Sequence, residues 1–192
     1  MQEVLSQLEG FIDAKADLEQ YVTHPKIAVD WLSNHKEDFV GKHVLDLGCG
    51  TGMLGILAGL LGASKVTFLD IDKDALEVCK RNLKEVDFSY EIVHRPLMSI
   101  DADVVVMNPP FGTKNRHADK QFVIASCLSA PVVHSMHLAG SEEFIAQVAS
   151  EYGHVMSHHR LFRFVLDNTM PMHTQHQKNI DVVTVRLTQQ DL

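Results

Sequence analysis

The sequence predicts a single α/β domain with a seven-stranded, mostly parallel sheet, helices on both faces and an antiparallel strand at the C-terminal end. Strand-like and helix-like patterns alternate along most of the 192 residues. A glycine-rich turn joins the first predicted strand to the next helix, and only a polar loop separates the last two strand-like runs. Sheets of this kind bind their ligands at the carboxyl ends of the parallel strands.

One domain is expected to span residues 1–192, with residues 1–35 forming an N-terminal helical cap segment. Apolar residues recur at helical spacing near its start, and a second helix is expected over about Lys26 to Asn34. The apolar positions of the first helix are Val4, Leu5, Leu8, Phe11 and Ile12.

Short apolar runs predict the strands and longer amphipathic runs predict the helices that follow. The predicted strands are His43–Leu47, Val66–Leu69, Ser89–His94, Asp103–Met107, Val132–Met136, His158–Leu166 and Asp181–Leu187. The predicted helices are Met53–Leu61, Lys73–Lys84, Asp119–Leu128 and one that begins after Ser141. Asp72 and Ser141 stand where a side chain can accept hydrogen bonds from the free N–H groups of a first helical turn, so both are expected to be N-caps.

The composition is typical of a globular protein in a reducing compartment. With 45% hydrophobic residues the chain can build a core, yet no segment approaches the roughly 18 consecutive apolar residues of a membrane span. The first residues, Met1 to Val4, lack the pattern of a secretion signal. Cys49, Cys79 and Cys127 have no CxxC spacing, which predicts reduced thiols and a cytoplasmic location.

The most informative run is Asp103–Gly112, an apolar strand that ends in Asn108, Pro109, Pro110 and Phe111. Proline has no N–H group and a restricted φ, so this turn offers carbonyl acceptors without competing donors. The Asn side chain adds an acceptor and the Phe ring adds a flat apolar face. The combination suits a planar ring that carries an exocyclic NH₂ group, although an Asn-Pro turn is also a common end for a strand.

A nucleotide site is predicted where the first strand ends in Asp46-Leu47-Gly48-Cys49-Gly50-Thr51-Gly52. Glycines let the backbone turn sharply and let a ligand lie against it. Asp70 ends the next strand, at the usual spacing for an acidic residue that binds ribose hydroxyls. Ile71 is placed to cover one face of an adenine.

The same loop, Gly50 to Gly55, also matches the dinucleotide fingerprint G-x-G-x-x-G. Two features favour S-adenosylmethionine over NAD. Asp46 would repel a pyrophosphate but suits the ammonium group of a methionine moiety. The Asn108–Phe111 turn, moreover, has no evident role in hydride transfer.

With these motifs in place, the chain resembles the class I methyltransferases that modify amino nitrogens. More narrowly, it resembles the methyltransferase-like-five family of ribosomal RNA adenine N6-methyltransferases, including archaeal members. The resemblance covers essentially the whole chain and implies a Rossmann-like fold. The matching stretches are Leu18–Thr23, Asp46–Gly52, Asp70–Leu76, Met107–Asn115, Ser135–His137 and the loop from Pro171 to His176.

The resemblance implies that Gln20 and Thr23 help to hold the methionine end of the cofactor. The family has an Asp after the third strand that contacts the adenine amino group, whereas this chain has Pro96. We therefore expect weaker cofactor binding unless Asp101 substitutes. Eukaryotic members pair with a small zinc-binding activator subunit through a sheet edge, which implies such a partner along residues 88–94.

The expected activity is methylation of an adenine N6 in structured RNA, specifically small-subunit ribosomal RNA. The Asn108 amide oxygen and the Pro109 carbonyl would each accept one N6 hydrogen, while Phe111 stacks on a flipped base. Lys114 and Arg116 fit either phosphate contacts or solvated loop charges. The polar loop 168–178 fits either a cover for the site or a plain connection.

A formal net charge of −8 is unfavourable for binding a polyanion such as RNA. Protonation of all twelve histidines would bring the net charge to +4, so affinity for RNA is expected to rise on acidification. No metal site is expected, because His134 and His137 are three apart on a predicted strand and point to opposite faces.

Three alternatives remain open from the sequence. One is glutamine N5-methylation of a protein such as a release factor, whose amide NH₂ presents similar hydrogen-bonding geometry. Another is adenine methylation of DNA. The third is a catalytically silent scaffold with a methyltransferase fold.

Overall fold

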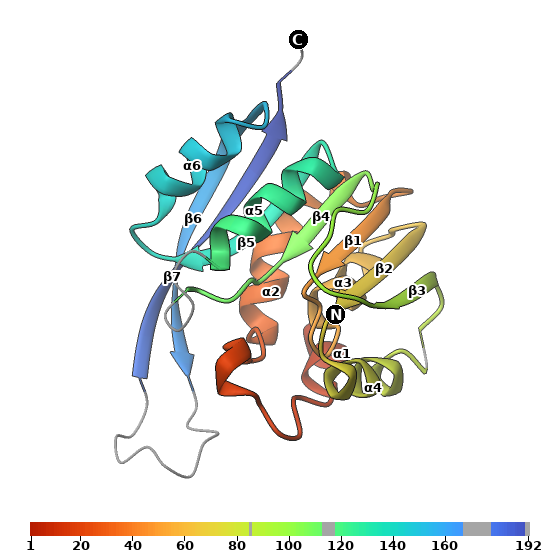
Figure 1. Cartoon of the computed structure of the whole chain (residues 1–192). Coiled ribbons are helices and arrows are strands. Elements are labelled where there is room, and N and C mark those ends of the chain that lie inside the picture. The colour runs from red at the N-terminus through yellow and green to blue at the C-terminus, as the bar shows by residue number, and fades with distance from the viewer. Residues whose placement is uncertain (85, 113–117, 167–177, 191–192) are drawn as a thin grey trace.

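A computed structural model of the chain describes residues 1–84, 86–112, 118–166 and 178–190 (Figure 1). Its seven-stranded sheet has the strand order β3-β2-β1-β4-β5-β7-β6. Strands β1 to β5 pair in parallel, whereas β7 is antiparallel to both β5 and β6. The strands are β1 (His43–Leu47), β2 (Lys65–Asp70), β3 (Ser89–His94), β4 (Val104–Met107), β5 (Val132–Leu138), β6 (His154–Leu166) and β7 (Lys178–Gln189). The predicted fold class is confirmed.

Helices cover both faces of the sheet, because a parallel strand can reach its neighbour only by crossing over. In Figure 1, α5 and α6 lie in front of the sheet, and α2 and α3 lie behind it. Two hydrophobic cores result, one on each face. One core contains residues of α2 (Pro25–Leu32), α3 (Met53–Leu60) and α4 (Lys73–Asn82), and the other contains residues of α5 (Ala118–Ser129) and α6 (Glu142–Ser150).

The N-terminal cap segment is less helical than its apolar spacing predicts. Helix α1 covers only Gln2–Ser6, and a 3-10 helix, η1, covers Ala16–Leu18. Between them the chain is held to the body of the protein, because the Asn82 side chain bonds to both the backbone N–H and the carbonyl of Glu9. The expected continuous helix over the first apolar positions is therefore wrong. Long-range anchoring competes here with helical periodicity.

The second predicted helix also ends early. Helix α2 stops at Leu32 and continues as a 3-10 helix, η2, over Ser33–Asp38. The His24 imidazole, at the N-cap of α2, accepts a hydrogen bond from the Lys26 N–H, and Pro25 occupies the first helical position. The helix is therefore capped at the end that meets the carboxyl edge of the sheet.

The two predicted caps behave differently. The Asp72 side chain accepts a hydrogen bond from the Asp74 N–H and caps α4, as predicted. Ser141 occupies the N-cap position of α6, but its hydroxyl donates to the Leu138 carbonyl at 2.7 Å instead. The prediction that Ser141 caps through its side chain is therefore wrong, because a local turn captures the hydroxyl.

The β6–β7 hairpin is longer than the strands beside it. Strand β6 begins at His154, four residues before the predicted start, and a bulge interrupts its pairing between Met156 and His158. Beyond the end of β5, residues 163–166 and 178–181 continue to pair with each other. Among the helices that the structure describes, none has the length and apolar character to cross a membrane.

Candidate active site

The turn between β1 and α3 is built on glycines in the left-handed region. Gly48, Gly50 and Gly52 have φ angles of +72°, +53° and +91°. A Cβ atom on Gly50 would lie 2.7 Å from the Phe11 ring, and one on Gly48 would lie 2.8 Å from the Phe122 ring. The glycines therefore permit both the turn itself and the close approach of two aromatic side chains.

Two aspartates at the ends of β1 and β2 hold this turn. Asp46 Oδ2 accepts a hydrogen bond from the Gly55 N–H at 2.7 Å. The two Asp70 oxygens accept from the Gly50 N–H at 2.7 Å and from the Asp72 N–H at 2.8 Å. Burial raises the pKa of Asp46 to about 7 and also raises the pKa of Asp70 despite its hydrogen bonds. Each carboxylate keeps lone pairs for a ligand donor.

Glu19 and Gln20 of the N-terminal cap form hydrogen bonds with residues around this turn. The Gln20 amide oxygen accepts from the Lys15 N–H at 2.8 Å, and its amide nitrogen donates to Asp72 at 2.7 Å. Glu19 has a φ of +50°, and among the described residues no other non-glycine has a positive φ. Its carboxylate accepts from the Phe111 N–H at 3.0 Å. These bonds link the turn after β2 to the turn after β4.

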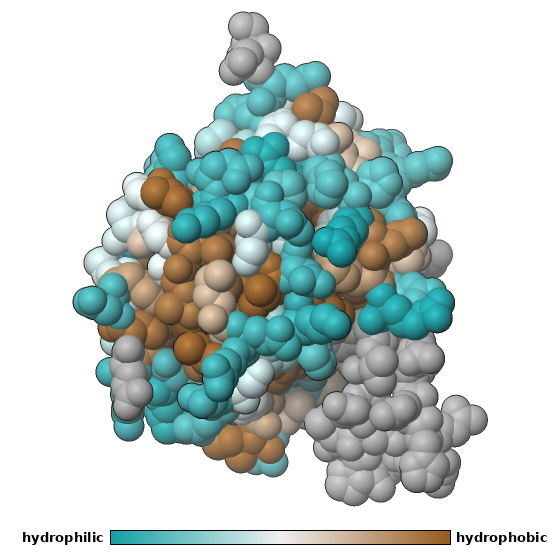
Figure 2. Space-filling model, turned by 180° about the vertical axis from the view of Figure 1, so that it is seen from behind, coloured by the Kyte–Doolittle hydropathy of each residue, from teal (hydrophilic) through white to brown (hydrophobic). Residues whose placement is uncertain are grey.

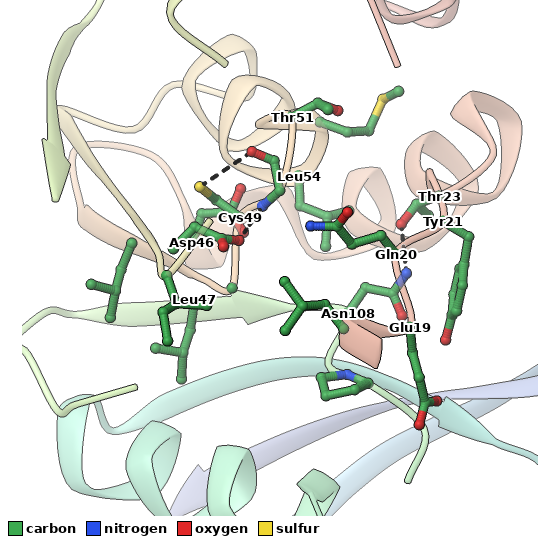
Figure 3. Close-up of a pocket in the computed structure, with 18 of the residues that line it drawn as sticks. Glu19, Gln20, Tyr21, Thr23, Asp46, Leu47, Cys49, Thr51, Leu54 and Asn108 are labelled. Carbon is green, nitrogen blue, oxygen red and sulfur yellow. Dashed lines mark hydrogen bonds between the residues drawn. The ribbon is translucent and has the colours of Figure 1, made fainter. Parts of the chain in front are cut away.

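Asn108 follows β4 and faces the same space. Its amide nitrogen donates to the Thr23 hydroxyl oxygen at 3.0 Å (Figure 3). Its amide oxygen is buried and accepts no hydrogen bond from the described part of the chain. Leaving a buried carbonyl oxygen unpaired costs about 1–3 kcal/mol, so this atom is a ready acceptor for a ligand N–H or O–H group.

The Phe111 side chain is half-buried and packs against an aromatic neighbour. The centroids of the Tyr21 and Phe111 rings lie 5.1 Å apart, with their planes tilted by 46°. Burial raises the pKa of the Tyr21 phenol, so this ring stays neutral. The two rings join the N-terminal cap to the Asn-Pro-Pro-Phe turn.

These residues surround a cavity of about 310 Å³ at the carboxyl ends of β1, β2 and β4 (Figure 3). Gly52, Pro109 and Phe111 do not line the cavity: Gly52 is the N-cap of α3, and Pro109 and Phe111 belong to the turn beside it. Ten of the sequence-predicted site residues do line it: Gln20, Thr23, Asp46, Gly48, Cys49, Gly50, Asp70, Ile71, Asn108 and Pro110.

Sequence reasoning missed several lining residues. Glu19 and Tyr21 belong to a stretch that carries the family resemblance, which is the one signal that could have singled them out. Phe11, Leu97 and Phe122 have no local signal, because only the fold brings them to the cavity.

The residues after β3 that line the cavity are not the two that the family comparison singled out. Arg95 and Leu97 line the cavity, whereas the exposed residues Pro96 and Asp101 do not. Lys114, Arg116 and residues 168–177 of the polar loop lie outside the described residues.

The cavity is rich in acceptors and negative charge. Asp17, Glu19, Asp46 and Asp70 line it, and within the described part of the chain Arg95 is its single Lys or Arg. Such a wall disfavours a pyrophosphate and suits a ligand with a cationic group, hydroxyls and a planar ring. S-adenosylmethionine combines these features, so the residues present fit that cofactor better than a dinucleotide.

The two histidines of β5 point to opposite faces, as their spacing predicts. His134 Nε2 lies 2.8 Å from Asp38 Oδ2, and His137 Nε2 lies 2.6 Å from Ser135 Oγ. Among the described residues, no group of three or more His, Cys, Asp or Glu side chains is arranged to hold a metal ion.

Comparison with known proteins identifies relatives over nearly the full chain. The methyltransferase small domain model matches residues 26–160. The rRNA N(6)-adenosine-methyltransferase METTL5 of Danio rerio is 34% identical, covering 98% of this chain and 97% of the relative. The crystal structure of PH1948 from Pyrococcus horikoshii superposes with a TM-score of 0.91 at 34% identity, over 98% of this chain and 95% of the other. Magnesium protoporphyrin IX methyltransferase from Synechocystis, solved with bound S-adenosylmethionine, shares the fold with a TM-score of 0.64 at 15% identity, over 86% of this chain and 77% of the other.

Proposed function

The chain belongs to the methyltransferase small domain family and to its METTL5 branch. On that premise we propose that it transfers a methyl group to the N6 atom of an adenine in structured RNA, specifically small-subunit ribosomal RNA. The methyl donor is S-adenosylmethionine, which supplies an electrophilic methyl group on a sulfonium when it is bound. We assign Asp46 and Asp70 to the binding of this donor and Asn108 to the target amino group.

The unpaired amide oxygen of Asn108 carries this proposal. Adenine N6 is a poor nucleophile, because its lone pair is delocalised into the ring. An acceptor on each N6 hydrogen favours a pyramidal nitrogen, whose lone pair is then available for attack. Asn108 lines the cavity, and its Oδ1 atom is buried without a partner among the described residues. The Pro109 carbonyl is the second acceptor in this proposal, and preorganised acceptors of this kind make large contributions to catalysis.

The cofactor assignments follow from the acids of the cavity. Asp70 is proposed to accept ribose hydroxyls, and Ile71 to cover the adenine face. Asp46 is proposed to pair with the ammonium of the methionine moiety. Gln20 and Thr23 are proposed to position that end of the cofactor, since both line the cavity and both already bond to neighbouring site residues.

Phe111 is proposed to stack on the target base after the base leaves its strand. Its ring packs on Tyr21 and stands beside the cavity, outside the space assigned to the donor. This arrangement supports a division between a cofactor site inside the cavity and a base site at its rim.

A partner subunit is proposed at the β3 edge of the sheet. Strand β3 is an edge strand, and it presents Tyr90, which is 44% exposed, beside Phe88 at a centroid distance of 6.5 Å. Leu60 on α3 is 41% exposed. Figure 2 shows a hydrophobic area on the side of the molecule where α3 and β3 lie. A small zinc-binding subunit that adds a strand to β3 would cover these side chains.

The experiment that tests the function is an assay of methyl transfer from labelled donor. Separated small-subunit ribosomal RNA, bulk RNA, DNA and a release factor serve as substrates, followed by analysis of the modified nucleosides or residues. We expect label in N6-methyladenosine from the small-subunit RNA. Label in glutamine or in DNA adenine would replace the proposal with one of the alternatives, and binding of S-adenosylhomocysteine without transfer to any substrate would remove it.

A further inference from the structure

A second cavity, of about 260 Å³, lies between the helical segment α2–η2 and the β6–β7 hairpin. It is separate from the cofactor cavity, with which it shares no lining residue. The residues that line it include Trp31, His35, His158 and Arg160, together with Asp30 and Asn34.

Arg160 brings an unneutralised positive charge to this cavity. Its guanidinium lies over the Phe162 ring, with the central carbon 4.6 Å from the ring centroid. Among the described residues it forms no ion pair with a carboxylate. The ring holds a flat cation in place without cancelling its charge, which leaves Arg160 free to meet a phosphate or a base.

The histidines add flat surfaces beside this cation. The His35 ring lies 5.1 Å from the His158 ring and 5.1 Å from the His134 ring, measured between centroids. His134 is fully buried, whereas His158 is exposed at the cavity. His and Arg planes are surfaces on which unpaired RNA bases stack.

Asp38 belongs to the same helical segment but does not line the cavity, and its charge does not oppose an anionic ligand. Asp38 accepts two hydrogen bonds from Arg186, at 2.7 and 2.8 Å, and lies 2.8 Å from His134 Nε2. Burial acts to raise the pKa of Asp38, but these partners hold it well below its usual range. The Asp38 charge is therefore compensated inside the protein. Asp30 is the one acid that lines the cavity, and it forms no ion pair with the described residues.

A local irregularity of β6 directs His158 and Arg160 toward the cavity. The bulge between Met156 and His158 shifts the register, so that His158 pairs with Arg186 and Arg160 pairs with Thr184. Arg186 also donates a hydrogen bond to Ser157, the residue at the bulge, at 2.9 Å. Bulges re-aim side chains and are frequent near functional sites.

We propose that this cavity binds one unpaired nucleotide of the RNA strand that carries the target adenine. The proposal rests on the proposed function, because it assigns RNA as the substrate. The base would stack on the exposed His158 ring, which the His35 ring supports edge-on at an interplanar angle of 66°, and its edge would meet Asn34 and Asp30. The phosphate would pair with Arg160.

The spacing of the two cavities fits a short stretch of single strand. Thr23 lines the cofactor cavity just before α2, and Asn34 lines the second cavity just after it. The helix has eight residues, which corresponds to about 12 Å along its axis. About two to four nucleotides bridge such a distance at ~3.4 Å or more per nucleotide.

Trp31 supplies a direct readout, because it is the single tryptophan of the chain and lines the second cavity. Its fluorescence is titrated with single-stranded hexaribonucleotides at saturating S-adenosylhomocysteine, which fills the cofactor site. We expect the oligonucleotide to quench this fluorescence, and we expect Arg160→Gln to bind the oligonucleotide with at least five-fold lower affinity than the wild type. Asn34→Asp, which adds a negative charge to the lining on the η2 side of the cavity, should weaken the affinity for the oligonucleotide similarly.

Arg163→Gln is the matched control. Arg163 is three residues further along β6, so it points to the other face, and it pairs with Asp181 at 3.2 Å. This variant should keep the wild-type affinity and the wild-type KM for ribosomal RNA, whereas Arg160→Gln should raise that KM with little change in kcat.

The outcomes separate the two proposals. Equal weakening by both arginine variants, or methylation of RNA with no response from Trp31, would overturn the nucleotide site and leave the function standing. Quenching with the expected variant pattern but no methylation of any RNA would keep the nucleotide site and remove the proposed function.

Discussion

The Asn108 side-chain amide donates a 3.0 Å hydrogen bond to the hydroxyl oxygen of Thr23, a residue 85 positions earlier in the chain. This bond fixes which end of the amide faces the cavity. With the nitrogen committed to Thr23, the amide oxygen is the atom left for a substrate N–H group. Thr23 is itself buried, so the orientation of Asn108 depends on the packing of the N-terminal cap.

Replacement of Thr23 by Val removes this acceptor and keeps the shape of the side chain. We expect kcat to fall by about 10- to 100-fold, because the amide loses its fixed orientation. Thr23→Ser keeps the oxygen and should retain most of the activity. Steady-state methylation of ribosomal RNA measures both variants, and equal activity of Val and Ser would show that Thr23 does not position Asn108.

Asp46 predicts a pH dependence of cofactor binding. Burial raises its pKa to about 7, so the carboxyl group becomes neutral as the pH falls through that value. A neutral Asp46 cannot pair with the ammonium of the methionine moiety. Affinity for S-adenosylhomocysteine should therefore be full above pH 7 and decline by at most about tenfold per pH unit below it.

Calorimetric titration between pH 6 and 8 tests this dependence. Asp46→Asn should bind weakly with a flat profile in this range, because its amide can still accept from Gly55 but carries no charge. Asp17 is an exposed residue at the same cavity, so Asp17→Asn should keep the wild-type profile. An unchanged profile for Asp46→Asn would assign the ionisation to another group.

Asp70 combines a structural role with a proposed binding role. Its oxygens accept from the Gly50 and Asp72 N–H groups, and its remaining lone pairs are assigned to ribose hydroxyls. Asp70→Ala should lower the affinity for S-adenosylhomocysteine by more than tenfold in calorimetry. With saturating donor, kcat should fall far less than it does for Asn108 variants. A large loss of kcat with unchanged affinity would contradict the assignment.

Phe111 is expected to act on RNA and not on the cofactor. Stacking of a base on an aromatic side chain contributes about 1–3 kcal/mol, so Phe111→Leu should raise the KM for RNA by roughly five- to 100-fold. Phe111→Tyr keeps the ring and should remain close to wild type. Binding of S-adenosylhomocysteine should be the same in all three proteins, and a parallel loss of cofactor affinity would place Phe111 in the cofactor site.

The central elements could be predicted because their signals are local. Strands β1 and β3 begin and end where the apolar runs predict, and Asp72 caps α4 as its position indicates. The carboxyl ends of β1, β2 and β4 meet at one edge in a parallel sheet, so the convergence of Asp46, Asp70 and Asn108 followed from the topology.

The remaining features depend on contacts between distant residues. The loss of helix after Ser6 follows from the bonds between Glu9 and Asn82, 73 positions apart. The Asp38–Arg186 pair joins residues 148 positions apart. The left-handed conformation of Glu19 also has no sequence signal, because non-glycine residues rarely adopt it and its neighbours must enforce it.

The central claim is that Asn108 activates an adenine amino group, and the Asn108→Ala variant tests it most directly. N6-methyladenosine is quantified by nucleoside mass spectrometry after incubation with small-subunit ribosomal RNA, and S-adenosylhomocysteine binding is measured on the same preparation. We predict a loss of methyl transfer of at least about 100-fold, with cofactor affinity within a few-fold of wild type. Methylation at the wild-type rate by this variant would contradict the account.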